Sequence, residues 1–183
     1  ISYQKSQRIL KKANIKIKDE NILSTNPLNK DCKKNIYSKL YYTSANNAAF
    51  DGYAINSSDT KEIKKNKSKA FKIIGTIAAG KKPFKKRINK YETVEIMTGG
   101  IIPKGFDTII PIERINFYPN KKIRKFILID KKVSKYNHVR FAGSDFKKNE
   151  LIIKKGTIIL PNHILALKTL GIKNIKVKKK VNI

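Results

Sequence analysis

The stretch at residues 91–113, YETVEIMTGGIIPKGFDTIIPIE, decides the fold that we expect of this chain. Thr93, Val94, Ile96 and Met97 have the β-branched and apolar side chains of a half-buried strand, and residues 107–110 predict a second strand that ends at Pro111. Between them, Gly99 and Gly100 predict a tight turn, because glycine reaches positive φ and leaves room for close approach. The stretch therefore predicts two strands joined by a rigid, glycine-rich tip.

The turn that begins at Thr98 is the first candidate site. A hydroxyl group and free backbone N–H groups at the tip of a strand can hold an oxyanion, since unpaired amide donors favour negative charge. The alternative is a plain β-hairpin without a ligand, which these residues taken alone favour.

A second candidate lies in residues 43–55, TSANNAAFDGYAI, which contain no lysine although the chain is rich in it. Asn46-Asn47 and Asp51-Gly52 are turn formers, and the alanines between them leave room for a backbone or a ligand. Asp51 therefore lies in a tight loop of small residues. Its carboxylate is either part of an Asx-turn or a site residue, and the turn is the more ordinary interpretation.

A third candidate is the stretch at residues 137–145, NHVRFAGSD. Residues 138–140 resemble the end of a strand, and residues 143–145 resemble a turn. This pattern brings Arg140 and Asp145 close together. The alternative is a local ion pair on a hairpin, which contributes little when it is exposed.

Hydrophobic periodicity predicts the other elements. We expect a helix at residues 2–17 with Ser2 as its N-cap, and a second helix at residues 161–170 that ends at Gly171. Strands or extended segments are expected at residues 35–42, 71–77, 126–130 and 173–181, with a hairpin formed by residues 151–153 and 157–160. The rest is expected to be polar loops and links, at residues 19–34 (with a short element near 22–28), 56–69, 81–90 and 115–122.

The charge of the chain first suggests a nucleic acid or an anionic membrane as its partner, because the formal net charge is +29 and the pI about 10.2. Only five of the 42 basic residues are arginines, however, and the charge is spread evenly along the chain. Proteins that recognise phosphates and bases rely on the guanidinium fork. We therefore expect a solvated lysine surface and no specific binding of nucleic acid.

The cysteine and histidine content excludes two further classes of protein. Cys32 is the only cysteine, so an internal disulfide cannot form, and a reducing compartment is expected. Together with His138 and His163 it gives too few ligands for an ordinary Cys/His zinc site. No apolar run reaches the length of a membrane span, and we expect no membrane partner.

Together, the three stretches resemble the N-terminal part of the MoeA/gephyrin E-domain family, the molybdopterin molybdenumtransferases. The family's N-S-A-M-D-G-Y-A motif corresponds to residues 47–54, its I-M-T-G-A-x-x-P-x-G-A-D run to residues 96–107, and its N-x-R-x-x-G-E-D motif to residues 137–145, with one additional residue between Asn137 and Arg140. A later G-x-x-L-x-P-x-x-I-x-x-L-x-x-x-G pattern matches residues 156–171. The four motifs follow the family's order over nearly the whole chain.

This resemblance implies a mainly β fold with a few short helices. A small β-barrel-like domain, residues 44–135, is expected to be inserted into an elongated α+β domain formed by residues 1–43 and 136–183. Family members continue into a nucleotide-binding α/β domain and a final β domain. Both are absent from this chain, which we interpret as a fragment that folds but is inactive alone.

The resemblance also implies an activity. Family members insert molybdate into adenylylated molybdopterin and release AMP and the molybdenum cofactor, with Mg²⁺ as the usual metal. A cytoplasmic homodimer is expected, with its cleft shared between subunits, and the upstream molybdopterin adenylyltransferase is a candidate partner. Two rival functions are a basic β module that binds RNA or an anionic protein, and a scaffold.

Matching positions in the family motifs give each candidate residue a role. Asp51 and Thr98 are expected to be catalytic, and Asp145 to be a metal or structural carboxylate. The expected substrate-binding residues are Asn47, Gly52, Gly99, Gly100 and Arg140. The departures from the motifs include Ala48 for Ser, Phe50 for Met and Ser144 for Glu. The last change removes a carboxylate and weakens the case for a metal at that turn.

Overall fold

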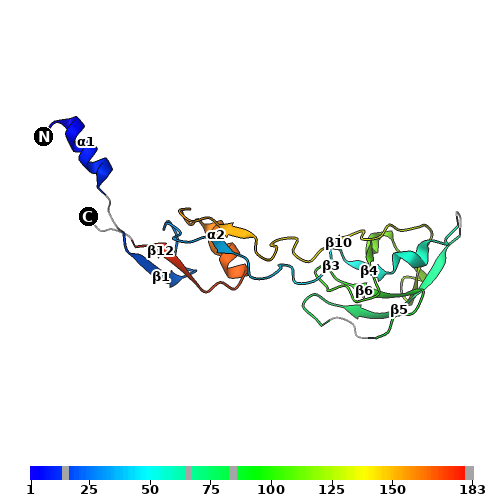
Figure 1. The fold of residues 1–183 in the computed structure, drawn as a ribbon. Helices are drawn as coiled ribbons and strands as arrows, with labels where there is room; N and C mark the ends of the chain where they lie inside the picture. The colour runs from blue at the N-terminus through cyan, green and yellow to red at the C-terminus, as the bar shows by residue number, and fades with distance from the viewer. Residues whose placement is uncertain (14–16, 65–66, 83–85, 180–183) are drawn as a thin grey trace. The chain divides into compact units, whose positions relative to one another are not determined.

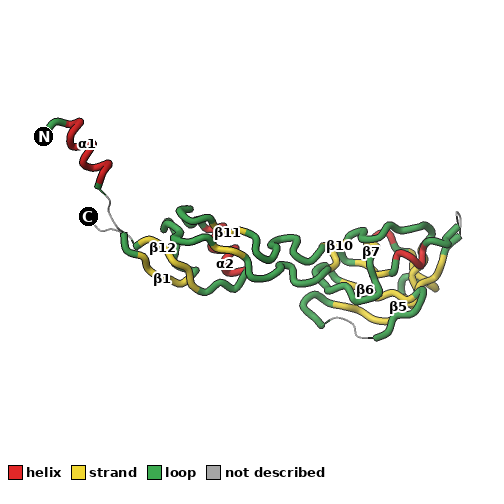
Figure 2. Tube along the Cα trace, viewed as in Figure 1, coloured by secondary structure: helices red, strands yellow, loops and turns green. Residues whose placement is uncertain are grey.

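The computed structural model describes residues 1–13, 17–64, 67–82 and 86–179. The chain forms two compact units (Figure 1). Unit 1 consists of Ile1–Leu40 and Lys147–Ile183, and unit 2 consists of Tyr41–Phe146. Strands and loops predominate in both units, as Figure 2 shows. The mainly β fold with short helices is therefore confirmed, whereas the predicted domain boundaries at residues 43/44 and 135/136 stay a prediction.

Unit 2 is built on a six-stranded half-barrel sheet. Its strands, in chain order, are β4 (Gly52–Ile55), β5 (Lys69–Ile77), β6 (Glu92–Ile96), β7 (Thr108–Pro111), β8 (Asn116–Pro119) and β9 (Arg124–Ile129). They lie side by side in the order β7-β4-β6-β5-β9-β8. Strands β5 and β6 are parallel, and the other neighbours are antiparallel.

Strand β4 lies between β6 and β7, so the hairpin interpretation of residues 91–113 is wrong. Gly52 makes this arrangement possible, because a Cβ atom there would lie 2.1 Å from the carbonyl oxygen of Ile110 on β7. The two strands of the deciding stretch are thus held together by a third strand from the second candidate stretch. Pro111 ends the edge strand β7, as its missing N–H group predicts.

The sheet is buried on both faces. Along β4, Ala54 packs in one apolar cluster with Val94 and Ile109, while Tyr53 and Ile55 pack in another on the opposite face. Alternate side chains of a strand point to opposite faces, so a strand with two covered faces is apolar throughout. This explains why all four residues of β4 are buried.

Two polar segments of unit 2 differ from the prediction. Residues 56–69 contain the 3₁₀ helix η1 (Ser57–Thr60), whose buried Ser57 donates from its N–H and hydroxyl groups to the Asp107 carboxylate at 2.8 and 3.0 Å. Residues 115–122 contain β8 instead of a link. Both segments are polar in sequence, but tertiary partners satisfy their hydrogen bonds. Residues 65–66 lie outside the described residues.

Three smaller elements complete unit 2, namely β3 (Asn47–Ala48), β10 (Val139–Arg140) and the 3₁₀ helix η2 (Ile112–Arg114). The chain enters and leaves the unit side by side. Tyr42 and Phe146 exchange two backbone hydrogen bonds of 2.8 Å each, in an antiparallel bridge.

Unit 1 contains α1 (Tyr3–Lys12), β1 (Asp19–Leu23), β2 (Ile36–Tyr37), β11 (Leu151–Ile153), α2 (Pro161–Thr169) and β12 (Asn174–Lys178). Strand β1 pairs with β12, and β2 pairs with β11, both antiparallel. The core of the unit is formed by Cys32, Ile153, Ile159, Leu167, Ile175 and Val177. The alternating strand predicted at residues 173–181 is confirmed in β12, and its last residues lie outside the described part of the chain.

Both helices of unit 1 begin where the sequence predicts. The Ser2 side chain accepts the N–H of Lys5 at 3.4 Å, and Pro161 opens α2, which Gly171 follows at φ +66°. Helix α1 ends at Lys12, earlier than predicted: Ile17 is not helical, and residues 14–16 lie outside the described residues. Over the four described ranges, no helix is long and apolar enough to cross a membrane.

The predicted hairpin of residues 151–160 is wrong. Strand β11 pairs with β2, while Ile158 forms a bridge with Asp31. The local turn at Lys154 and Lys155 is present, but each of its arms finds a partner in the N-terminal half of the chain. Partners so distant in sequence leave no trace in a local pattern.

Candidate functional site

The three candidate stretches meet at one end of the sheet in unit 2. Strand β3 pairs with β10, so that Ala48 faces Val139 and Asn47 faces Arg140. On its other side, the N–H of Ala48 donates to the carbonyl oxygen of Gly100 at 3.0 Å. Backbone hydrogen bonds thus hold residues 47–48 between the glycine turn and the third stretch. We call this arrangement the three-strand junction.

At this junction, two hydrogen bonds join Asp51 and Thr98. Asp51 Oδ1 accepts the backbone N–H of Thr98 at 2.6 Å and its hydroxyl at 2.7 Å. The backbone hydrogen bond, and then the hydroxyl, lower the pKa of Asp51 because both stabilise the charged carboxylate. The Asx-turn interpretation of Asp51 is wrong, since its carboxylate binds a residue 47 positions away.

Asp51 keeps one carboxylate oxygen open. Oδ2 accepts no hydrogen bond from any residue that the structure describes, and Asp51 is exposed. Its backbone carbonyl accepts the N–H of Ile112 at 3.0 Å, which fixes the position of the turn. Asp51 therefore presents an ionised, accessible oxygen from a rigid backbone.

The expected free amides at the tip of β6 are absent from residues 98–100. The N–H of Thr98 donates to Asp51, that of Gly99 to the carbonyl of Ala48 at 2.9 Å, and that of Gly100 to the carbonyl of Met97 at 2.8 Å. The amides close the junction, so these three cannot also serve as oxyanion donors. The sequence shows that such amides exist, but it does not show which acceptors they find.

The glycines of the site have structural explanations. Gly99 lies at φ +79°, in the left-handed region that favours glycine. A Cβ atom on Gly100 would lie 2.8 Å from Cγ1 of Ile96, and Gly52 is required by β7. Substrate contacts of Gly52, Gly99 and Gly100 stay predictions.

Arg140 and Asp145 form an ion pair, as their spacing predicts. The Nε–H of Arg140 also donates to the hydroxyl of Ser144 at 3.1 Å. The guanidinium group thus already pairs with the carboxylate of Asp145. In addition, the described ranges contain no group of three or more His, Cys, Asp or Glu that could hold a metal. The metal role of Asp145 and the substrate role of Arg140 stay predictions.

Two contacts at the junction were not recognised in the sequence. Asn46 ties the second and third stretches together, because its Oδ1 atom accepts the N–H of Ala142 at 3.0 Å, while the predicted substrate residue Asn47 is buried beside it. The half-exposed ring of Phe50 contacts the ring of His138 edge to face, with 5.0 Å between centroids. The partners of each contact lie far apart in sequence, so a local pattern could not predict either contact. The only hint was the aromatic residue Phe50 beside Asp51, at a position where the family motif has Met.

Comparisons with known proteins give a family match and a set of similar proteins. The family model described as "MoeA N-terminal region (domain I and II)" matches residues 1–171. Similar proteins include the molybdopterin molybdenumtransferases of Staphylococcus aureus, 31% identical over 134 residues (73% of this chain, 30% of the relative), and Haemophilus influenzae, 29% identical over 155 residues (85% and 36%). This chain therefore spans about a third of the length of these curated relatives.

The fold is similar to that of a solved structure. The crystal structure of the molybdopterin biosynthesis moeA protein from Pyrococcus horikoshii OT3 superimposes with a TM-score of 0.84 at 26% sequence identity. The match covers 98% of this chain and 46% of that protein.

Proposed function

This chain belongs to the family of MoeA N-terminal regions, and from that premise we propose that it forms part of the site at which a molybdopterin molybdenumtransferase inserts molybdate into adenylylated molybdopterin. The reaction releases AMP and the molybdenum cofactor. The observation that carries the proposal is the pair of hydrogen bonds from Thr98 to one oxygen of Asp51, at the point where the three family motifs meet.

The two residues would have different tasks in this reaction. The Thr98 hydroxyl donates a hydrogen bond to Asp51, so the lone pairs of its oxygen remain to accept a hydrogen bond from the substrate. For Thr98 to donate to molybdate, its hydroxyl must rotate away from Asp51, and the backbone N–H of Thr98 would then still hold the carboxylate. Asp51 thereby keeps Thr98 in position, and its free Oδ2 can accept a hydrogen bond from the substrate.

Mg²⁺ is part of the proposal as a partner of the substrate. In proteins it takes most of its oxygens from waters and substrate phosphates, with one or two carboxylates. The free Oδ2 of Asp51 could provide one such carboxylate contact. Asp145, by contrast, would first have to give up its ion pair with Arg140. When bound, the ion would offset negative charge on the substrate oxygens.

Residues 1–183 correspond to only part of the proposed enzyme. The curated relatives are about three times as long as the region they share with this chain. We propose that the site works together with the family's nucleotide-binding domain in a homodimer, and that residues 1–183 alone do not catalyse the reaction. Direct contact with the upstream adenylyltransferase is a further part of this proposal.

A chimera tests the proposal. This chain would replace the matching region of the Staphylococcus aureus molybdenumtransferase, and cofactor formation would be measured from purified adenylylated molybdopterin and limiting molybdate. We expect the chimera to make cofactor and its Asp51→Asn variant to make almost none. Circular dichroism and size-exclusion chromatography would verify that both proteins fold. A folded chimera without product, or an Asp51→Asn variant with undiminished product, would contradict the proposal.

A further inference from the structure

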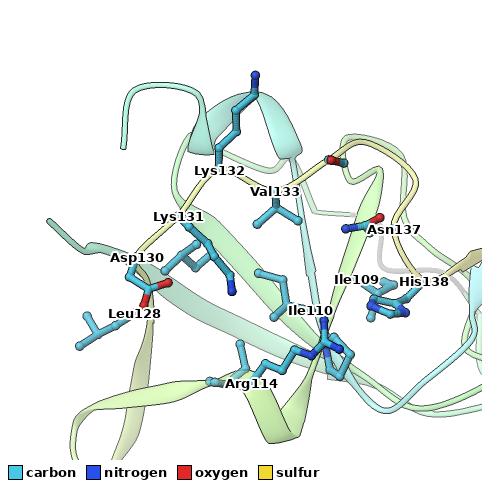
Figure 3. Close-up of a pocket in the computed structure, with 14 residues that line it drawn as sticks. Ile109, Ile110, Arg114, Leu128, Asp130, Lys131, Lys132, Val133, Asn137 and His138 are labelled. Carbon is cyan, nitrogen blue, oxygen red and sulfur yellow. The ribbon is translucent and has the colours of Figure 1, made fainter. Parts of the chain in front are cut away.

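A pocket of about 130 Å³ lies in unit 2, beside strand β7 (Figure 3). Its walls come from three segments: β7 with the following 3₁₀ helix η2, the end of β9 with the loop after it, and Asn137 and His138. Apolar side chains form its floor, among them Ile109, Ile110 and Val133. The pocket lies next to the three-strand junction, because His138 lines it and also contacts Phe50.

Two cations of the pocket have no partner. The side chains of Arg114 and Lys131 form no hydrogen bond or ion pair with any residue in the described ranges. Arg124 and Arg140, by contrast, face carboxylates. Figure 3 shows Lys131 reaching over the pocket toward Ile110, and Arg114 crossing its lower edge. A guanidinium and an ammonium group therefore converge on one small space with their donors unused.

The other polar groups at the rim add donors rather than negative charge. The side-chain amide of Asn137 has no hydrogen-bond partner among the described residues, and His138 offers a ring nitrogen. Asp130 is the one acidic residue among those that line the pocket, and its single charge is smaller than that of Arg114 and Lys131 together. Lys132 also lines the pocket, but its ammonium group points away from it in Figure 3.

We propose that this pocket binds a phosphate group, either as inorganic phosphate or as the end of a phosphate monoester. A planar carboxylate offers two oxygens in one plane, whereas a tetrahedral oxyanion offers oxygens in several directions to Arg114, Lys131 and Asn137. The guanidinium fork matches two phosphate oxygens, and the ammonium group adds a point charge. The apolar floor strengthens both contacts by lowering the local dielectric.

The site does not depend on the proposed reaction, since it uses none of the residues that hold Asp51 and Thr98. Its selectivity must be distinguished from the general attraction of anions to a chain with a net charge of +29. General attraction acts through the whole surface and weakens equally for any substituted surface lysine. At a specific site, the phosphate affinity should instead fall only when a lysine of that site is substituted.

The test is a titration of the ¹⁵N-labelled chain with sodium phosphate at constant ionic strength, followed by amide chemical shifts. We expect saturable shifts at Arg114, Lys131 and His138. Arg114→Gln and Lys131→Gln should each weaken phosphate binding by about tenfold, the effect of losing one charge-assisted hydrogen bond. The matched control, Lys132→Gln, removes the same charge from the neighbouring residue and should change the affinity by less than about twofold.

Two further ligands identify the anion. Sodium acetate at the same ionic strength should bind about tenfold more weakly than phosphate, because it loses one of the charged contacts. Glycerol phosphate distinguishes the two sources of the group: binding as tight as that of phosphate indicates a monoester, and weaker binding indicates free phosphate. Three results would each contradict the proposed site. They are chemical shifts that do not saturate, acetate binding as tight as phosphate binding, and equal losses of phosphate affinity in Lys131→Gln and Lys132→Gln. Preserved spectral dispersion would verify the fold of every variant.

Discussion

Asp51 and Thr98 are joined by two hydrogen bonds that end on the same carboxylate oxygen, one from the backbone at 2.6 Å and one from the hydroxyl at 2.7 Å. The second oxygen of Asp51 is left open. One side chain thus fixes the end of strand β6 and at the same time presents a negative charge to solvent. Because these two tasks use different oxygens, substitutions can separate them.

The hydroxyl of Thr98 should matter for activity more than for folding. In the Staphylococcus aureus chimera, Thr98→Ala should lower the rate at limiting molybdate by about a hundredfold, the usual effect of losing a positioned polar group. Thr98→Ser keeps the hydroxyl and should retain most of the rate, and both variants should unfold near the temperature of the parent. Equal rates for the alanine and serine variants would remove the hydroxyl from the site.

The lowered pKa of Asp51 predicts a pH dependence of stability. The folded-state pKa lies below that of the unfolded chain, so the stabilisation is complete above the unfolded value of about 4 and is lost as the pH falls through the folded value. The difference in unfolding free energy between the parent and Asp51→Asn should therefore be constant above about pH 5 and should shrink below about pH 4. Urea denaturation at several pH values measures it.

The Thr98→Ala variant separates the two causes of that shift. The backbone N–H is the larger cause and survives the substitution. The pKa of Asp51, followed by carboxyl ¹³C chemical shifts, should rise in Thr98→Ala but stay below the ordinary value. A full return to that value would mean that the hydroxyl alone holds the carboxylate.

Gly52→Ala should disrupt the sheet of unit 2. The new methyl group would lie 2.1 Å from the carbonyl oxygen of Ile110, so β4 and β7 would have to separate, at a cost of about 3 kcal/mol. Gly80→Ala is the matched comparison, since no atom lies within 4 Å of its Cβ position and only its φ of +72° opposes alanine. That substitution should cost about 1 kcal/mol. Urea denaturation measures the loss of unfolding free energy in each variant. Similar losses for Gly52→Ala and Gly80→Ala would contradict the close packing of β4 against β7.

Binding of nucleic acid should be weak and without sequence preference. The motivation is the even distribution of lysines, which attracts any polyanion through released counterions. Fluorescence anisotropy with two oligonucleotides of equal length and scrambled sequence should give equal affinities that fall steeply with salt. Nanomolar, sequence-selective binding at physiological salt would instead support an RNA-binding module.

A shared cleft predicts rescue between two inactive chains. One chimera would contain Asp51→Asn, and the other would be disabled in the nucleotide-binding domain. If the cleft joins halves from different subunits, a mixed C₂ dimer contains one intact cleft and should recover at most about half of the parent activity. Mixed dimers as inactive as both parents would mean that each cleft is built within one chain.

Sequence patterns predicted the elements whose evidence is local. Strands β5, β6 and β12 and helix α2 have their own periodicity and end signals, and all four formed at nearly the predicted residues. The proximity of Arg140 and Asp145 followed from their spacing in one turn.

The errors concern partners that are distant in sequence. The insertion of β4 between β6 and β7 depends on the missing side chain of Gly52, and the amides of Thr98 and Gly99 find acceptors in the second candidate stretch. The same limit explains the false hairpin at residues 151–160, whose two arms pair with N-terminal residues. Local patterns show which groups need partners, whereas the fold decides which partners they find.

The bridge between Tyr42 and Phe146 places the two ends of unit 2 side by side. A segment whose ends already meet can be excised, cyclised through a short linker, or transplanted into a loop of another protein. Each of these changes costs little chain entropy, because the folded unit already holds its two ends together. The same property makes unit 2 suitable for circular permutation. New termini could then be opened in an exposed loop far from Asp51, while the old ends are joined across two residues that already share backbone hydrogen bonds.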